Sequence, residues 1–157
     1  MPRISPALYQ GAMALIMQSA GYQYELISKN KFIVHKSNRS LYVDASGRNL
    51  PYYDRNSNKE GFSWETYISL KRLQTIEEIA SEHEAESWIA YCYAIFGEKY
   101  IRYFSITIKL EDKLFGAKFI RTSTFRKYMQ ERSPNAWDVL NIPKDKVPIL
   151  TLNPEDI

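Results

Sequence analysis

The residue types best suited to acid–base or metal chemistry are concentrated in residues 82–91 (EHEAESWIAY). Helical spacing places Glu86 at the border of an apolar stripe, beside Ile79 and Ala90 and one turn after Glu82. Partial burial and the like charge of Glu82 would both raise the pKa of its carboxyl group. A raised carboxyl pKa suits a general acid, a general base or a metal ligand. We therefore take Glu86 as the candidate catalytic residue.

His83 precedes Glu86 by three residues, so on a helix its imidazole can hydrogen-bond the carboxylate. We expect His83 to support Glu86 in this way. Two plainer interpretations stay open. Glu86 could form an ion pair with a strand residue such as Arg102, and His83 could be a hydrogen-bonded histidine of the core.

Common catalytic signatures are absent from the sequence. It has no P-loop, no GxGxxG, no HExxH, no CxxC pair and no GxSxG motif, and its 2 histidines exclude a histidine-rich metal site. A PD-(D/E)xK nuclease needs an Asp on one strand and Glu-x-Lys on the next. Asp44 is predicted to end a strand, but the literal Glu-x-Lys at residues 111–113 lies in a predicted turn far downstream, so this match is poor.

Charge alternates along the chain although the net charge is only +3. Residues 1–74 contain ten basic and five acidic residues. Residues 75–98 contain no basic and six acidic residues, and residues 99–132 contain nine basic and three acidic residues. This layout suits a protein that binds a polyanion and keeps carboxylates for a metal ion or for proton transfer. It equally suits an acidic helix paired with basic strands. The candidate nucleic-acid contacts are Arg102, Lys118, Arg121, Arg126 and Lys127.

A single α+β domain over residues 1–157 is expected to position these groups, with flexible tails at residues 1–7 and 153–157. The pattern predicts an antiparallel β-sheet packed by a long central helix and several shorter helices. The expected helices are residues 8–20, 64–73, 76–96 and 125–132, with a further turn of helix at 136–140. The expected strands are residues 22–28, 32–36, 41–44, 100–110, 117–123 and 147–152, and the longest loop is 45–61.

The composition is that of a globular protein. A chain of 157 residues with 45% hydrophobic residues can bury a sizeable core. Cys92 is the lone cysteine and lies in an apolar run, which favours a buried side chain over a nucleophile. The apolar run at residues 12–17 is too short for a signal sequence or a membrane span, so we expect no membrane association.

The segment at residues 83–88, in a chain of this length, resembles the small nuclease of lipothrixviruses, the filamentous viruses of Acidianus, and the resemblance extends over the whole chain. It implies a viral nuclease of the host-cell cytoplasm that acts on linear double-stranded DNA, with Glu86 as the key catalytic residue and a fold unlike the common nuclease folds. The expected cofactor is Mg²⁺, with Glu86 as its ligand. The residues alone do not decide between a metal ligand and a general base.

Two other classes of protein fit the same sequence. A non-catalytic viral DNA-binding or packaging protein would use the basic segments without needing Glu86, and a protein-interaction module would need neither. The sequence sets no expectation for the oligomeric state.

Overall fold

The computed structural model describes residues 4–51, 64, 66–132, 139–142 and 146–157. Its main feature is a six-stranded sheet in the order β1-β2-β3-β5-β7-β6, with β4 and β8 forming a separate antiparallel pair. The helices are α1 (Pro6–Ser19), α2 (Leu70–Glu82), η1 (Glu98–Tyr103), α3 (Thr122–Arg132), α4 (Val147–Leu150) and η3 (Pro154–Asp156). The strands are β1 (Gln23–Ser28), β2 (Lys31–Lys36), β3 (Arg39–Leu50), β4 (Thr66–Ser69), β5 (Glu86–Ile95), β6 (Ile108–Leu110), β7 (Lys113–Arg121) and β8 (Val139–Ile142).

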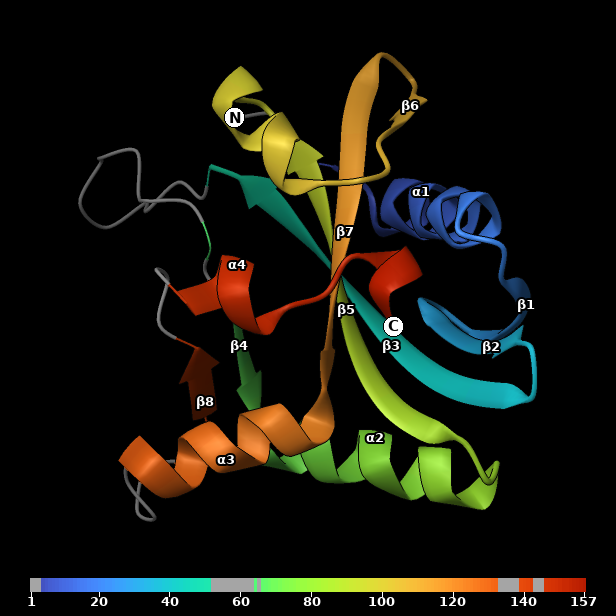
Figure 1. Ribbon diagram of the computed structural model, residues 1–157, viewed down its shortest axis with the longest axis vertical. Coiled ribbons are helices and arrows are strands. Elements are labelled where there is room, and N and C mark those ends of the chain that lie inside the picture. Colours follow the sequence, from blue (N-terminus) through green and yellow to red (C-terminus); the bar gives the residue numbers. More distant parts are fainter. Residues whose placement is uncertain (1–3, 52–63, 65, 133–138, 143–145) are drawn as a thin grey trace.

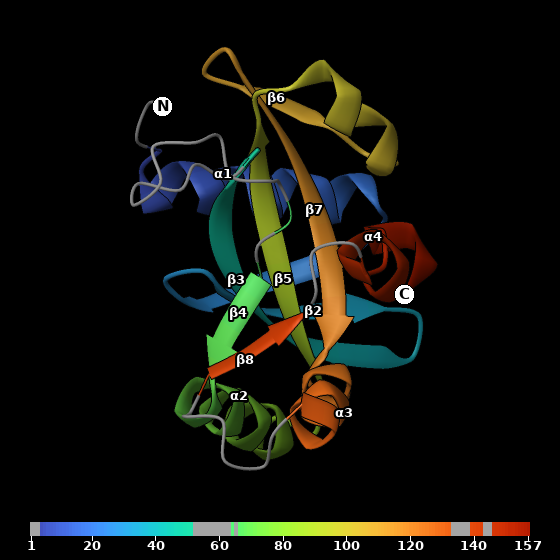
Figure 2. The same ribbon diagram turned by 90° about the vertical axis from the view of Figure 1, so that its left-hand side faces the viewer.

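The predicted α+β class is confirmed, with helices on both faces of the sheet. One face packs against α1, and the other packs against α2, α3, α4 and the β4–β8 pair (Figures 1 and 2). Every pairing in the main sheet is antiparallel except that of β3 with β5, which is parallel. The sheet is therefore mixed and not purely antiparallel, and α2 lies in the connection that a parallel pair requires.

The prediction of one long helix over residues 76–96 is wrong. Helix α2 ends at Glu82, the chain turns at Glu84 with φ 51°, and β5 begins at Glu86. Residues 88–95 are buried on both faces of the sheet, so their sequence is a nearly continuous apolar run. A run of this kind fits a buried helix as well as a central strand, and periodicity does not separate the two.

The alternation of side chains in β5 divides the interior into two cores. Trp88 and Cys92 face α1, whereas Ile89 and Tyr93 face the opposite core. Cys92 is buried as predicted, and burial raises the pKa of its thiol, which disfavours the nucleophilic thiolate.

Strand β3 is longer than predicted and continues to Leu50. Asp44 therefore lies in the middle of a strand and not at its end, and residues 45–50 of the expected loop are part of the sheet. Helix α2 begins after Ser69, whose hydroxyl accepts a hydrogen bond from the backbone N–H of Arg72, and residues 66–69 are a strand in place of the predicted helix. Residues 52–61 of the predicted loop lie outside the described residues. Of the turn of helix predicted at 136–140, residues 136–138 also lie outside them, and residues 139–140 belong to strand β8 instead.

The chain ends differ from the expected tails where the structure describes them. Ile4 is buried and Ser5 caps α1. At the other end, residues 154–156 form η3, Pro154 is buried, and the Tyr22 hydroxyl donates to the Pro154 carbonyl at 3.0 Å. The strand predicted at residues 147–152 is replaced by α4, although Leu152 makes an antiparallel bridge with Phe119.

The hairpin expected from the strands predicted at residues 100–110 and 117–123 forms only in part. Residues 98–103 make the 3-10 helix η1, and the strand pairing is limited to β6 and β7. None of the helices in the described part of the chain combines the length and the apolar character that a bilayer crossing requires.

Tyr9 of α1 packs directly over Gly47 of β3, and this contact generates a test of the fold. A Cβ atom at Gly47 would overlap the Tyr9 ring, which also packs edge-on against Phe115 at a centroid distance of 5.9 Å. We expect Gly47→Ala to lower the free energy of unfolding by about 1–3 kcal/mol because α1 must shift. The measurement is urea unfolding followed by circular dichroism.

Gly11→Ala is the matched control. Its Cβ would meet only the Leu110 side chain at 3.5 Å, and alanine favours a helix over glycine by roughly 0.5–1 kcal/mol. A Gly47→Ala protein as stable as the wild type would contradict the packing of α1 on β3.

Candidate active site around Glu86

Glu86 lies at the first position of β5, where its carboxylate is held by Arg39 of β3. The Arg39 Nε donates to Glu86 Oε2 at 2.8 Å and Nη2 donates to Oε1 at 2.7 Å, which is a bidentate pair. The Trp88 indole N–H donates to Oε1 at 3.3 Å, and the Arg121 Nη1 lies 3.5 Å from the same oxygen. The Glu86 side chain is 30% exposed, so the carboxylate is fixed by its hydrogen bonds and still accessible to solvent.

Strand pairing brings these residues together. The parallel ladder of β3 and β5 pairs Leu41 with Glu86, which places Arg39 beside the carboxylate. The antiparallel ladder of β5 and β7 pairs Trp88 with Arg121, and the guanidinium of Arg121 lies 4.5 Å from the Trp88 ring centroid.

The electrostatics of Glu86 are the reverse of those expected from a helix. The hydrogen bonds from Arg39 hold the pKa of the Glu86 carboxyl below its ordinary value, against the opposing effect of partial burial. The predicted rise in the pKa of Glu86 was wrong, because Glu86 is on a strand beside cationic groups and not on a helix one turn after Glu82. Glu86 is therefore ionised at neutral pH, which suits a proton acceptor and not a general acid.

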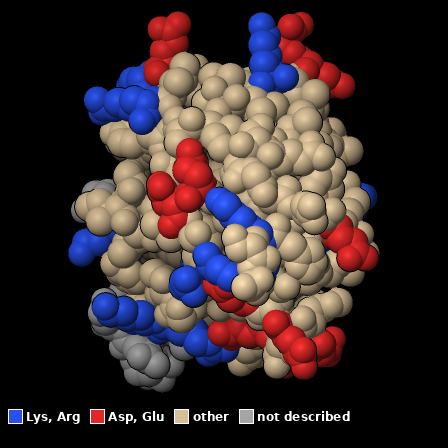
Figure 3. All heavy atoms as spheres, turned by 45° about the vertical axis from the view of Figure 1, so that its right-hand side comes forward, with Lys and Arg blue, Asp and Glu red and all other residues tan. Residues whose placement is uncertain are grey.

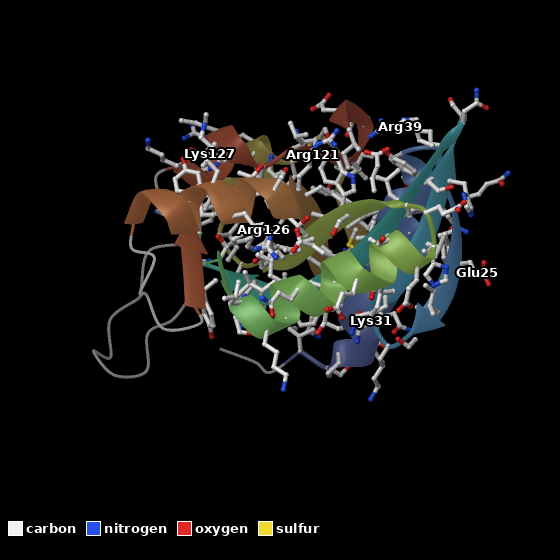
Figure 4. All side chains as sticks on the ribbon, turned by 90° about the horizontal axis from the view of Figure 1, so that it is seen from below. Glu25, Lys31, Arg39, Arg121, Arg126 and Lys127 are labelled. Carbon is white, nitrogen blue, oxygen red and sulfur yellow. The ribbon has the colours of Figure 1, made fainter. Side chains whose placement is uncertain are left out.

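The surface around Glu86 consists mainly of basic side chains that lie against aromatic rings. We define it by four residues and call it the Glu86 surface: Lys36, Arg39, Glu86 and Arg121. The Lys36 ammonium lies 4.9 Å from the Tyr22 ring centroid. Burial raises the pKa of the Tyr22 hydroxyl, Arg39 lowers it and Glu86 raises it. Arg39 and Arg121 lie on the same side of the molecule (Figure 4). Basic side chains gather at the centre and lower left of the face drawn in Figure 3, with acidic ones beside them.

His83 does not have the predicted relation to Glu86. It caps the C-terminus of α2, it is exposed, and no hydrogen bond or ion pair joins its side chain to Glu86 among the described residues. The turn at Glu84 removes the helical spacing on which the supporting role depended.

Of the basic residues predicted to bind nucleic acid, only Arg121 contacts Glu86. Arg102 donates to the Tyr103 hydroxyl at 2.9 Å and is not the partner of Glu86. Arg126 forms an ion pair with Glu77, and Lys127 is exposed on α3. These residues are dispersed because they lie on η1, β7 and α3.

Lys118 is the least accessible of the predicted contacts. It is 4% exposed, and its ammonium donates to Asn153 Oδ1 at 3.0 Å. Burial lowers the pKa of Lys118. The prediction that Lys118 contacts nucleic acid directly does not fit this burial.

Arg39 is the functional candidate that the sequence did not identify. It is separated from Glu86 by 47 residues and lies at the start of a strand after a turn, with no motif joining the two. A bidentate arginine–carboxylate pair between two strands becomes visible only once the strand order is known.

The residues around Glu86 do not fit a Mg²⁺ site. Both carboxylate oxygens accept hydrogen bonds from Arg39, and a second guanidinium lies within 4 Å. Among the residues that the structure describes, no group of three or more His, Cys, Asp or Glu side chains could hold a metal ion. Mg²⁺ prefers several oxygen ligands, and two guanidinium groups disfavour a cation at this position.

No protein-family model matches the sequence, and no curated protein matches it. Among solved structures, the chain is similar to Hjc, a Holliday junction resolvase from the archaeal hyperthermophile Archaeoglobus fulgidus. The TM-score is 0.51 at 11% sequence identity, and the match covers 92% of this chain and 95% of that chain. The chain has a resolvase-like fold. This likeness does not support the expectation of a fold unlike the common nuclease folds, and it leaves the lipothrixvirus resemblance as a sequence-based expectation.

The Arg39–Glu86 pair generates a prediction about pH. Its stabilising effect is present above the unfolded pKa of a glutamate, about 4.3, and is lost as the pH falls through the lower folded pKa. We expect Arg39→Gln to raise the pKa of Glu86 towards that ordinary value and to make stability less dependent on pH in this acidic range. The measurement is an NMR titration of the Glu86 carboxyl carbon.

Arg102→Gln is the control, because Arg102 binds Tyr103 and should leave the Glu86 titration unchanged. An unaltered Glu86 pKa in Arg39→Gln would show that this pair does not control the carboxylate.

Proposed function

We propose that the chain is a nuclease that hydrolyses phosphodiester bonds of linear double-stranded DNA with little sequence preference, with Glu86 as its key catalytic residue. The observation that carries the proposal is an ionised, partly exposed carboxylate held between the guanidinium groups of Arg39 and Arg121. The resolvase-like fold supports DNA as the polymer, because the similar protein is named for acting on DNA junctions.

The Glu86 surface contains the groups that hydrolysis requires. A DNA phosphate that binds the guanidinium groups of Arg39 and Arg121 takes the place of the carboxylate as their partner. Glu86 then accepts a proton from a water molecule as that water forms a bond to phosphorus. The two guanidinium groups neutralise the negative charge that develops on the phosphorane. The P–O bond to the leaving sugar oxygen breaks, and that oxygen takes a proton from solvent. The chain's own residues account for the proton acceptance and the charge neutralisation, and solvent supplies the proton for the leaving oxygen.

A non-catalytic DNA-binding or packaging protein is the second candidate function. The bidentate contact between Arg39 and Glu86 favours it, since a pair of this geometry also serves to join two strands. Under this alternative the basic side chains bind phosphates, whereas Glu86 has a structural role.

Glu86→Ala separates these two functions. We expect the variant to fold and to lose cleavage of linear double-stranded DNA by about two to four orders of magnitude, because the proton acceptor is removed. Initial rates on an end-labelled duplex, with thermal unfolding as a check of folding, provide the measurement. His83→Gln is the matched control and should cleave nearly as well as the wild type, since His83 is exposed and makes no hydrogen bond or ion pair with Glu86. Equal rates for wild type and folded Glu86→Ala would exclude Glu86 as the catalytic residue.

DNA binding should depend on salt through Arg121 and not through Arg126. The Arg121 side chain is 52% exposed beside Glu86, whereas Arg126 is already paired with Glu77. Arg121→Gln should reduce the slope of log affinity against log salt by about 0.9, the effect of one phosphate contact. Arg126→Gln should leave the slope close to that of the wild type. Fluorescence anisotropy with duplexes of unrelated sequence measures both slope and sequence preference. Equal slopes for the two variants, or selection of one duplex, would contradict this assignment.

A further inference from the structure

A second cluster of charged side chains lies on the face of the sheet opposite to Glu86. Alternation along β3 sends Val43 and Ala45 into the core under α1, so Asp44, Ser46 and Arg48 project from the other face. Arg72, in the first turn of α2, joins them there. We call these four residues the Arg48–Arg72 cluster.

Arg72 organises the cluster. Its Nη2 donates to Asp44 Oδ1 at 2.6 Å and to Ser46 Oγ at 2.7 Å. Asp44 is 5% exposed, whereas the Arg72 side chain is 36% exposed. Neither Nε nor Nη1 of Arg72 makes a hydrogen bond to any described residue, and the side chain keeps this exposure to solvent.

Arg48 supplies a second cation beside the first. Its guanidinium lies 5.4 Å from the Tyr91 ring centroid and 5.6 Å from that of Tyr67, and its Nη1 donates to the Gly47 carbonyl at 2.8 Å. Arg48 makes no ion pair in the part of the chain that the structure describes. The cluster thus has two guanidinium groups and one carboxylate, which leaves an excess positive charge at a partly covered position.

Two buried hydroxyl groups beside this cluster have no hydrogen-bond partner among the described residues. Tyr42 lies two residues before Asp44 on the same face of β3. Burial raises the pKa of its hydroxyl, the charge of Asp44 raises it further, and the charge of Arg72 lowers it. Tyr93 in β5 is the register partner of Arg48. Burial raises the pKa of the Tyr93 hydroxyl, and the charge of Arg48 opposes this rise. Both side chains are fully buried, and a buried hydroxyl without a partner is costly.

The N-terminus of α2 adds to the positive potential. Arg72 is in the first turn of this 13-residue helix, where backbone N–H groups and the helix dipole favour an anion. Guanidinium groups are planar and bind the oxygens of a phosphate through paired N–H donors, whereas they disfavour a metal cation.

We propose that Arg48 and Arg72 form a second phosphate-binding site, on the face of the sheet opposite to Glu86. The site takes a phosphate group, either of a nucleic acid backbone or of a small phosphate compound. Arg48 and the N–H groups on Nε and Nη1 of Arg72 bind its oxygens, while Asp44 and Ser46 hold Arg72 in place. The nucleic-acid source rests on the proposed function, whereas the phosphate site itself does not.

Arg48→Gln is the variant that tests the site, because it removes one cation and leaves the Arg72–Asp44 ion pair intact. Lys29→Gln is the matched control, since Lys29 is exposed in the turn between β1 and β2. Arg72→Gln serves as a second variant, with thermal unfolding as a check, because it leaves the buried Asp44 without its partner. In the first arm, inorganic phosphate is titrated at constant ionic strength and binding is followed by NMR. In the second arm, a short labelled duplex is titrated with proteins that all carry Glu86→Gln, so that the probe stays uncut.

We expect Arg48→Gln to weaken phosphate binding by about tenfold relative to the wild type and Lys29→Gln. We also expect it to reduce the salt slope for the duplex by about 0.9. Loss in the phosphate arm without a change in the duplex arm would support the site and assign it to a small phosphate compound. Equal phosphate binding by wild type, Arg48→Gln and Lys29→Gln would overturn the proposal. The phosphate arm uses no DNA, so its outcome is independent of whether the chain cleaves DNA.

Discussion

The parallel pairing of β3 with β5 is the constraint on which the arrangement of the molecule depends. Two parallel neighbours cannot be joined by a hairpin, so the chain crosses one face of the sheet between them, and α2 lies on that crossing. The register over residues 41–50 and 86–95 sets Arg39 beside Glu86. The same register sets Arg48 beside Tyr93 on the opposite face. Both candidate phosphate-binding surfaces therefore follow from one strand pairing.

The side-chain alternation of these strands then separates the two surfaces. On the α1 side, a carboxylate lies between guanidinium groups, and its low pKa keeps it charged at neutral pH. On the α2 side, there are again one carboxylate and two arginines, but the carboxylate of Asp44 is buried and pairs with only one of them. The first arrangement suits proton acceptance next to a bound phosphate, whereas the second suits binding without chemistry.

The likeness to the resolvase is one of fold. At 11% identity it shows the path of the backbone alone. The Glu86 surface depends on arginine and tryptophan neighbours, and it lacks the set of oxygen ligands that a divalent cation prefers. Fold and chemistry are thus separate questions here, and substitutions at Glu86 and Arg39 address the second.

The amino-acid sequence by itself determined the α+β class, the first helix, the three antiparallel strands that follow it and the buried Cys92. Local signals carry each of these: helical spacing over residues 8–20, turn residues between short strands, and an apolar run around Cys92. The choice of Glu86 as the catalytic residue also came from the sequence, and it stays a prediction. The tertiary structure decided that residues 86–95 form the central strand and that Arg39, not His83, is the partner of Glu86. A strand buried on both faces has no periodicity that distinguishes it from a buried helix, and contact between residues 47 positions apart depends on strand order. The direction of the Glu86 pKa shift depends on those neighbours, so it was decided by the fold and not by the segment around the residue.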